Sequence, residues 1–567
     1  MEKKWLPASV KEVKALGWDE LDIILITGDA YVDHPSFGAA VIGRILEAEG
    51  YRVAIVPQPN WRDDLRDFKK FGRPKLFFGV TAGNMDSMVN QYTANKRLRS
   101  DDAYTPGNKA GFRPDYPTIV YSRILKELYP GTPMILGDIE ASLRRLTHYD
   151  YWKNQIIPSL LVDSGADLIS YGMGDTVMPK IAKVLKNGFN MKLLRRIDQV
   201  AFIADGKYVD RLEDKIVLNS YEECLRDPRA FCDNFVTVET ESNKINSKIL
   251  VEPVGGKFVV VNPPSGVMKS EELDRTYELP FTRLPHPRYI GKGAIPAYDM
   301  IKFSINIHRG CFGGCSFCTI SAHQGKYVVS RSERSIIGEI ESLKKLPDFK
   351  GNLSDLGGPS ANMYGMMGKE QGLCNKCSRP SCIYPSVCRN LNNDHDRIIK
   401  LYRRVRSLKG IKKVFIGSGI RYDMFINDEQ DKYLPEVIIH HTGGRLKVAP
   451  EHTEDNVLKA MRKPPFALYQ KLHARFKDVC AENKLPYQLI PYFISSHPGC
   501  CEKDMAKLGR TVGKLNLRLE QVQDFTPTPM TLSSVMFATG IDPYTGEKIF
   551  VETEQEKKRR QRNYFFD

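Results

Sequence analysis

The first 223 residues of this 567-residue chain contain no cysteine, although the whole chain contains 12. Seven of these cysteines fall between residues 311 and 388. Proteins held together by disulfides are small and secreted, so the length and this uneven distribution exclude a disulfide scaffold. Clustered thiols in a long chain indicate metal ligands instead.

Long apolar runs are absent as well. The longest, such as Ile23–Ile26, have the length of a strand, whereas a membrane helix needs roughly 20 apolar residues. The start, Met1–Trp5, is not followed by the apolar segment of a secretory signal. There is no internal repeat or low-complexity tract, and 42% of the residues are hydrophobic, which is typical of a globular protein. We therefore expect a cytoplasmic protein of two large domains with no membrane partner.

The formal net charge is +15, which favours contact with nucleic acid but also occurs in ordinary basic proteins. Two basic stretches, 397–413 and 557–562, show the ambiguity. The first carries apolar residues at helical spacing, with Asp394 or Asp396 placed to cap the helix. Its basic residues are therefore expected on the solvent-exposed face of an amphipathic helix. The second is interpreted as a surface tail. Nucleic acid stays an open question as a partner.

Residues 21–190 alternate strand and helix signals, which predicts a parallel sheet with helices on both faces. Expected strands are 21–27, 52–56, 75–80, 133–136 and 166–170. A second strand and helix series begins near Ile301, with strands at 302–307, 413–416, 446–448, 488–494 and 519–525, and is typical of a full or partial (β/α) barrel. The fold class is thus α/β, with a Rossmann-like domain at 1–195, a proline-rich connector at 196–295, a barrel domain at 296–530 that carries a cysteine-rich insertion at 359–392, and a tail at 531–567.

The strongest motif is Cys311-x3-Cys315-x2-Cys318, directly after an apolar strand. Three thiolates in one glycine-containing loop can bind three irons of a cubane cluster, whereas ordinary iron–sulfur proteins supply four. The fourth iron is then open to a substrate, as in radical-SAM enzymes, where the amino and carboxylate groups of S-adenosylmethionine chelate it. A structural zinc site would instead show two separated pairs of ligands.

Most of the chain resembles the YgiQ-type radical-SAM proteins, a bacterial family with no established reaction. The resemblance rests on Asn262–Pro264, Arg283–Pro287, Ile305–Ile320, His323–Gly325, Ser330–Ser332, Asp355–Tyr364, Lys447–Thr453 and Phe525–Pro529. It implies a [4Fe–4S] cluster on Cys311, Cys315 and Cys318, with S-adenosylmethionine bound and reductively cleaved to a 5′-deoxyadenosyl radical. It also implies a reductant such as flavodoxin or ferredoxin. The alternative is a non-catalytic iron–sulfur sensor or electron-transfer protein.

The resemblance further implies which residues contact S-adenosylmethionine. Phe317 is expected near the adenine, and Gly357 and Gly358 near the methionine amino group, although Pro359 stands where the family pattern has an acidic residue. Arg421 could pair with the carboxylate, or be a surface arginine. Further candidates at a strand end are Lys447, Glu451 and His452.

Two regions leave alternatives open. Cys374-x2-Cys377-x4-Cys382-x5-Cys388 could hold zinc, a second cluster or nothing, and we expect the four to converge on one site. The N-terminal domain resembles cobalamin-binding domains, whose D-x-H-x-x-G signature is displaced here to Asp33-His34-Pro35-Ser36-Phe37-Gly38. His34 is therefore not assigned as a cobalt ligand.

Overall fold

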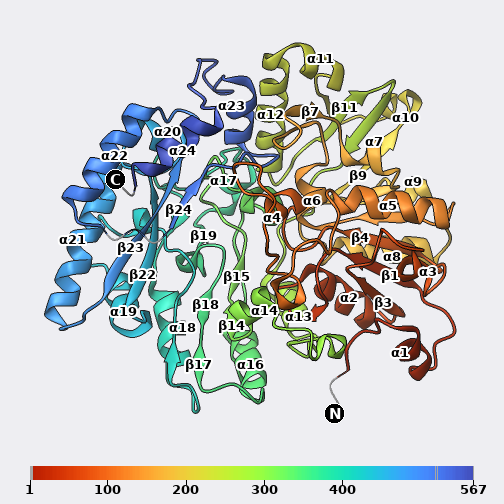
Figure 1. Ribbon diagram of the computed structural model, residues 1–567, viewed down its shortest axis with the longest axis horizontal. Coiled ribbons are helices and arrows are strands. Elements are labelled where there is room, and N and C mark those ends of the chain that lie inside the picture. The colour runs from red at the N-terminus through yellow and green to blue at the C-terminus, as the bar shows by residue number, and fades with distance from the viewer. Residues whose placement is uncertain (1–3, 518, 520, 566–567) are drawn as a thin grey trace. The chain divides into compact units, whose positions relative to one another are not determined.

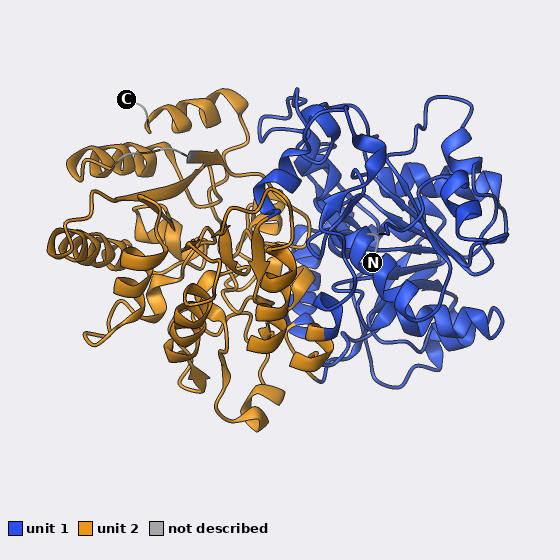
Figure 2. Ribbon diagram, turned by 90° about the horizontal axis from the view of Figure 1, so that it is seen from below, with its two compact units in different colours: residues 1–242, 246–266, 275–302 blue, residues 243–245, 267–274, 303–567 orange. Residues whose placement is uncertain are grey.

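The computed structural model describes residues 4–517, 519 and 521–565, which form two compact units. Unit 1 comprises residues 1–242, 246–266 and 275–302, and unit 2 comprises residues 243–245, 267–274 and 303–567 (Figure 2). Both units are α/β, as the alternating signals predict.

Unit 1 is built on a nine-stranded sheet of order β10-β11-β12-β9-β8-β5-β4-β1-β3 (Figure 1). Its strands are β1 (Ile23–Thr27), β3 (Val53–Pro57), β4 (Phe77–Thr81), β5 (Met134–Leu136), β8 (Leu168–Ser170), β9 (Val200–Ala204), β10 (Lys215–Val217), β11 (Ile249–Val254) and β12 (Lys257–Val261). Strands β3, β1, β4, β5 and β8 run parallel, which confirms the Rossmann-like sheet predicted from their apolar runs.

From β1, the strand order of this sheet builds outward in two opposite directions. The chain runs first to β3 through α2 (Gly38–Ala48), and later from β4 to β5 through α5 (Pro117–Leu128). Because parallel crossovers are right-handed, these two helices cover opposite faces. The carboxyl ends of β1 and β4 flank the point where the order reverses, which is where sheets of this kind bind ligands.

The segment 196–295, which we expected to be a connector, supplies strands β9 to β12 of the same sheet. These strands add on beyond β8, and β9 and β12 pair antiparallel to their neighbours. Val200, Phe202, Val251 and Val260 of these strands are buried in the unit 1 core. The prolines that argued against regular structure stand after this sheet, in residues 263–287.

The remaining helices of unit 1 are α1 (Val10–Ala15), α3 (Arg66–Lys69), α4 (Ser87–Gln91), α6 (Asp138–Leu143), α7 (Leu160–Ser164), α8 (Val177–Lys186), α9 (Met191–Leu194), α10 (Gly206–Asp210), α11 (Tyr221–Arg226), α12 (Pro228–Ser242) and α14 (Pro296–Ile301). Helix α13 (Ser270–Tyr277) runs across a boundary between the units. Two short pairs complete unit 1: β2 (Val32–Asp33) with β13 (Leu284–Pro285), and β6 (His148–Asp150) with β7 (Gln155–Ile157).

Unit 2 repeats strand and helix in chain order, as a partial barrel does. Its strands are β14 (Ser304–Asn306), β15 (His308–Arg309), β16 (Val329–Ser330), β17 (Asn352–Leu353), β18 (Asp355–Gly357), β19 (Met367–Gly368), β20 (Leu391–Asn392), β21 (Lys413–Val414), β22 (Arg445–Glu451), β23 (Gln488–Ser495) and β24 (Gln521–Asp524). Parallel pairing joins β14 to β18, β17 to β21, and β22 to β23 and then β24. Residue 520 of the strand expected at 519–525 lies outside the described residues.

The helices of unit 2 are α15 (Ile320–Gln324), α16 (Glu333–Leu343), α17 (Gln371–Asn375), α18 (Asp396–Arg406), α19 (Tyr433–His441), α20 (Asp455–Ala460), α21 (Phe466–Glu482), α22 (Glu502–Lys514), α23 (Leu532–Thr539) and α24 (Gln555–Asn563). Helix α18 is the amphipathic helix predicted from the basic stretch, with Ile398, Leu401 and Val405 buried. Asp394 accepts the backbone N–H of Asp396 at its start.

The C-terminal basic stretch 557–562 lies in helix α24, and its residues Lys557, Arg559, Arg560 and Arg562 are exposed as expected, whereas Lys558 is not. Lys558 of α24 is only 1% exposed, and its ammonium lies 4.6 Å from the ring centroid of Phe537 in α23. The interpretation of 557–562 as a wholly exposed basic stretch is therefore wrong for this residue. The long methylene stem of a lysine can pack against apolar neighbours while its charge meets an aromatic face.

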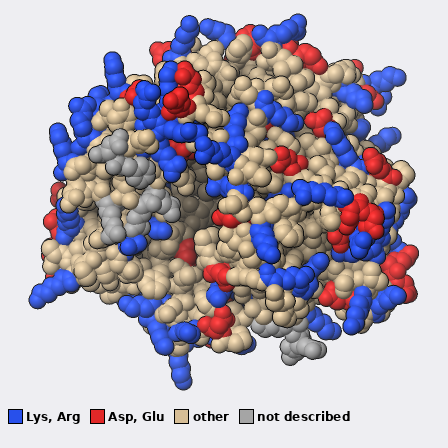
Figure 3. Space-filling model, in the orientation of Figure 1, with Lys and Arg blue, Asp and Glu red and all other residues tan. Residues whose placement is uncertain are grey.

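No helix among the described residues is long and apolar enough to cross a membrane. On the face shown in Figure 3, Lys and Arg are scattered with Asp and Glu between them. The positive charge on that face is thus not gathered into one uninterrupted patch.

Candidate functional site

The loop Cys311–Cys318 of unit 2 follows β14 and β15 closely. Its ends are held by backbone contacts: Cys311 N–H donates to Gly325 O (3.1 Å), and Cys318 N–H donates to Cys315 O (3.2 Å). Gly310 has a φ of +84°, and a Cβ there would lie 2.2 Å from Tyr327 O, so only glycine fits the entry to the loop. The three cysteine residues keep some exposed surface, and their loop follows the parallel strand β14.

The three thiols of this loop interact with one another. Burial, together with the charges of Cys315 and Cys311, raises the pKa of Cys318 to about 12. Burial likewise raises the pKa of Cys311 to about 11, while Arg421 and Lys463 act in the opposite direction. A metal holds thiols as thiolates, and these two cations would stabilise that charge.

Arg421, which was left open between a carboxylate partner and a surface residue, lies beside the cysteine loop. Its Nη1 donates to Cys315 Sγ at 3.3 Å, and its Nε and Nη2 donate to the two carboxylate oxygens of Asp423 at 3.0 and 2.6 Å. Asn362 fixes its backbone, accepting from Arg421 N–H (2.8 Å) and donating to Arg421 O (3.0 Å). Sequence reasoning missed Asp423 and Asn362, although the R-x-D spacing could have indicated the first.

Gly357 and Gly358 end β18, next to the loop 417–421. A Cβ on Gly357 would lie 2.7 Å from Ser418 Oγ, and one on Gly358 would lie 2.4 Å from Cε1 of buried His308. Asp355 joins the two loops by accepting from Gly417 N–H (2.8 Å) and from the Ser418 hydroxyl. Close packing of the chain therefore requires glycine, which has no side chain, at both positions.

Phe317 is half-buried and meets His497 edge to face, with ring centroids 6.0 Å apart. His497 Nε2 lies 2.7 Å from Ser533 Oγ, and that hydroxyl donates to Ser316 Oγ at 2.8 Å. His497, from the loop after β23, and Ser533 of α23 thus position the aromatic ring between the second and third cysteines of the loop.

The three candidates in and after β22, which are Lys447, Glu451 and His452, differ in their burial and in their partners. Glu451 is buried, with a φ of +69° and a salt bridge of 3.5 Å to Lys463. His452 turns away into the core, accepting from Glu454 N–H at 3.0 Å, and burial lowers its pKa to about 4. Lys447 is exposed. Of the three, Glu451 is the one whose charge acts on Cys318.

The second group of cysteines lies in the excursion between β18 and α18. The paired strands β19 and β20 close this excursion, and Cys374, Cys377, Cys382 and Cys388 lie between them. All four thiols are partly exposed. Burial raises the pKa of Cys382 to about 11; nearby Lys326 lowers it, and Cys377, Cys388 and Cys374 raise it again.

Among the described residues, no group of three or more His, Cys, Asp or Glu side chains is placed to hold a single metal ion. This holds for both cysteine groups. Ligands of one zinc ion surround it at about 2.3 Å and so converge closely. Ligands of a cubane cluster each bind a different iron and stand further apart.

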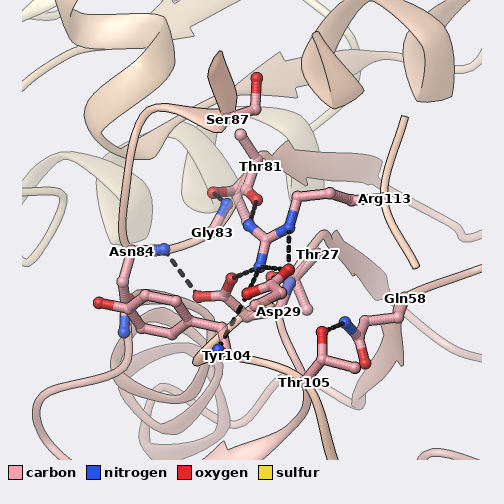
Figure 4. A network of polar contacts seen from close by, with 12 residues as sticks. Thr27, Asp29, Gln58, Thr81, Gly83, Asn84, Ser87, Tyr104, Thr105 and Arg113 are labelled. Atoms are coloured by element: carbon pink, nitrogen blue, oxygen red, sulfur yellow. Dashed lines mark hydrogen bonds and ion pairs between the residues drawn. The ribbon is translucent and has the colours of Figure 1, made fainter. Parts of the chain in front are cut away.

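In unit 1, the carboxyl ends of β1 and β4 carry a buried charge network (Figure 4). Arg113 pairs with Asp29 (2.9 Å) and with Asp102 (3.0 Å), and Asp29 also accepts from Asn84 N–H (2.7 Å). Burial raises the pKa of Asp29 to about 6. The residues at this ligand-binding end of the sheet are thus largely engaged with one another.

His34 lies in the displaced cobalamin-like signature and is only 1% exposed. Its Nδ1 accepts the Ser36 N–H at 3.1 Å, and burial holds its pKa well below the usual range. Its Nε2 has no hydrogen-bond partner among the described residues, and the ring is enclosed by the protein and does not reach out of it. We assign no cobalamin ligand to this unit.

Comparison with known proteins places the chain in a family. Residues 5–304 match the model described as Radical SAM N-terminal. A UPF0313 protein of Bacteroides thetaiotaomicron is 57% identical over 581 residues, covering 99% of this chain and 94% of the relative. A UPF0313 protein of Methanocella arvoryzae is 47% identical, covering 97% and 91%. The chain belongs to the UPF0313 family.

The UPF0313 chain also resembles a solved structure, the radical S-adenosylmethionine methyltransferase TsrM from Kitasatospora setae with cobalamin and a [4Fe–4S] cluster bound. The TM-score is 0.51 at 14% identity, and the match covers 90% of this chain and 77% of that one. A second TsrM structure, with tryptophan substrate and the S-adenosylmethionine analogue aza-SAM bound, gives a TM-score of 0.50 at 13% identity, over 90% and 75% of the chains. This likeness confirms the fold class: an α/β protein with an N-terminal Rossmann-like sheet domain followed by a partial (β/α) barrel.

Proposed function

We propose that this UPF0313 protein is a radical-SAM enzyme. The observation that carries the proposal is the loop of Cys311, Cys315 and Cys318, whose thiols interact with one another at a strand end and meet the guanidinium of Arg421. When bound there, a [4Fe–4S] cluster with an open iron supplies the electron that cleaves S-adenosylmethionine to a 5′-deoxyadenosyl radical. A one-electron donor such as flavodoxin or ferredoxin would provide that electron.

The chain's own residues would hold the ligands in place. The three thiolates would bind the cluster, and Arg421 would stabilise their charge from a position fixed by Asp423. Gly357 and Gly358 would let S-adenosylmethionine approach the backbone, and Phe317 would pack near its adenine. Support for these roles comes from their common neighbourhood: the loop 417–421 contacts both the glycine strand end and the cysteine loop.

The test is anaerobic reconstitution with iron and sulfide, followed by dithionite and S-adenosylmethionine and an assay for 5′-deoxyadenosine. We expect formation of 5′-deoxyadenosine by the wild type and none by the Cys311→Ala/Cys315→Ala/Cys318→Ala variant. Cys480→Ala, which removes a buried thiol of α21 outside both cysteine groups, is the matched control. A wild-type protein that binds iron but forms no 5′-deoxyadenosine would favour the sensor or electron-transfer alternative.

A further inference from the structure

Lys326 is a buried cation beside the cysteine-rich excursion. It is 2% exposed and stands between α15 and β16. Its Nζ donates to Arg379 O (2.8 Å) and reaches Cys377 Sγ (3.8 Å), and it lies 4.9 Å from the ring centroid of Tyr327. In the described part of the chain, no carboxylate forms a salt bridge with it. A buried ammonium is costly unless a negative charge compensates it, so this arrangement points to an anionic group among its neighbours.

The neighbours of Lys326 are the four cysteines of the excursion. Its charge acts on both Cys374 and Cys382, and each of these also interacts with Cys377 and Cys388. Cys374 Sγ accepts a hydrogen bond from Asn390 Nδ2 at 3.3 Å. N–H groups and cations directed at cysteine sulfurs are what iron–sulfur clusters use to stabilise their thiolate ligands.

The backbone leaves room for these sulfurs. A Cβ on Gly368 would lie 2.3 Å from Cys374 Sγ, so a side chain there would displace the thiol. The pairing of β19 with β20 brings the two ends of the excursion together, and Cys388 N–H donates to Cys382 O at 2.7 Å. The chain therefore wraps around its cysteines with little apolar support beyond a small core that includes Ile383 and Leu391.

We propose that Cys374, Cys377, Cys382 and Cys388 bind a second [4Fe–4S] cluster, with Lys326 as its charge partner. Four thiolates complete the ligand set of a cubane, so this cluster would have no open iron. Zinc is the poorer fit because the four thiols do not converge on a single ion. The proposal does not depend on cleavage of S-adenosylmethionine at the first site.

The two sites would be neighbours within unit 2. Cys382 N–H donates to Phe312 O (3.0 Å), and the Ser381 hydroxyl donates to Gly313 O (2.8 Å). Gly314 has a φ of +63°, and a Cβ there would lie 2.6 Å from Pro380 O. The excursion thus packs directly on the loop that joins Cys311 to Cys315.

The test counts metal in the full chain after anaerobic reconstitution with iron and sulfide. We expect about eight irons per wild-type chain, and about four in either the Cys311→Ala/Cys315→Ala/Cys318→Ala variant or the Cys374→Ala/Cys377→Ala/Cys382→Ala/Cys388→Ala variant. The first variant keeps the second site intact, and should show a reducible [4Fe–4S] signal by Mössbauer and electron paramagnetic resonance spectroscopy. Cys480→Ala should retain the wild-type count.

The proposal is overturned if wild-type protein holds only about four irons, or if the first variant holds zinc or no metal. These outcomes are read from metal content and are independent of 5′-deoxyadenosine formation. In that same variant background, Lys326→Met should shift the reduction potential of the remaining cluster to a more negative value, and Lys326→Arg should restore it. An unchanged potential in Lys326→Met would remove the lysine from the proposal.

Discussion

Nη1 of Arg421 lies 3.3 Å from Sγ of Cys315, although 106 positions separate the two residues in the sequence. Asp423 takes two of the other guanidinium nitrogens, so the cation is held toward the sulfur on a fixed support. A guanidinium used in this way has few donors left for the carboxylate of S-adenosylmethionine. Its first effect should therefore be on the cluster and not on the affinity for S-adenosylmethionine.

Replacing Arg421 by methionine should make the reduction potential of the first cluster more negative. In the wild type, the positive charge of Arg421 and its hydrogen bond to a ligand sulfur both stabilise the reduced cluster, which carries one more electron. The substitution removes both, so the cluster becomes harder to reduce. The measurement is a redox titration followed by electron paramagnetic resonance, in the variant that lacks Cys374, Cys377, Cys382 and Cys388. Lys413→Met, which removes an exposed cation of β21, is the control. If Arg421→Met instead leaves the potential unchanged and weakens S-adenosylmethionine binding, the carboxylate role is correct.

Gly358→Ala should weaken S-adenosylmethionine binding at least tenfold. The new methyl would lie 2.4 to 2.8 Å from three atoms of the buried His308 ring, so either the ring or the strand end must move. Isothermal titration of the reconstituted protein measures the effect. Gly338→Ala in α16 is the matched control, because a Cβ there has nothing within 4 Å. An affinity equal to wild type would show that this strand end does not contact the ligand.

The sequence predicts the parts of the site that depend on local pattern. Three local patterns predict structure correctly: the C-x3-C-x2-C spacing, the apolar runs of β1, β3 and β4, and the helical period of α18. The loop, the strands and the helix are all found where these patterns place them. Lys463 carries no such pattern. Its charge acts on Cys311 only because the fold brings distant segments of the chain together, which a single sequence does not encode locally.

The extent of the unit 1 sheet and the burial of Lys558 were also hard to predict, because both depend on contacts between distant parts of the chain. Strands β9 to β12 are short, and the prolines after them suggested irregular structure, yet β9 pairs with β8 and the other three strands extend the sheet beyond it. Lys558 was predicted at the surface from charge alone, and is buried because α24 packs on α22 and β23. Tertiary contact decided both cases over local composition.

Ser533→Ala should destabilise unit 2 by about 1–3 kcal/mol, because it leaves buried polar partners unsatisfied. The Ser533 hydroxyl lies 2.7 Å from His497 Nε2 and donates to Ser316, which ties α23 to the cysteine loop. Thermal unfolding monitored by circular dichroism gives the difference. Ser534→Ala is the control, since the Ser534 hydroxyl is buried with no hydrogen-bond partner among the described residues and its loss should be nearly neutral. Equal destabilisation by both substitutions would contradict the role given to Ser533.

The last prediction concerns the pH dependence of unit 1 and the buried carboxyl of Asp138. Burial, together with the nearby charge of Asp29, raises the pKa of Asp138 to about 7. The carboxyl accepts from the Thr81 hydroxyl at 3.0 Å, and its backbone has a φ of +72°. In the unfolded chain the same group titrates near its ordinary pKa of about 3.9.

Between these two pKa values the folded state binds more protons than the unfolded state, so stability falls as the pH rises. This one group should cost about 3 kcal/mol between pH 5 and pH 8. Asp138→Asn mimics the protonated form, can still accept from Thr81, and tolerates the left-handed backbone. Its stability advantage over the wild type should therefore grow from pH 5 to pH 8 and level off above that. Denaturant titrations at several pH values measure this, with exposed Asp210→Asn as the control that shows no such trend. A constant difference between Asp138→Asn and wild type across this range would show that Asp138 is ionised in the folded protein throughout.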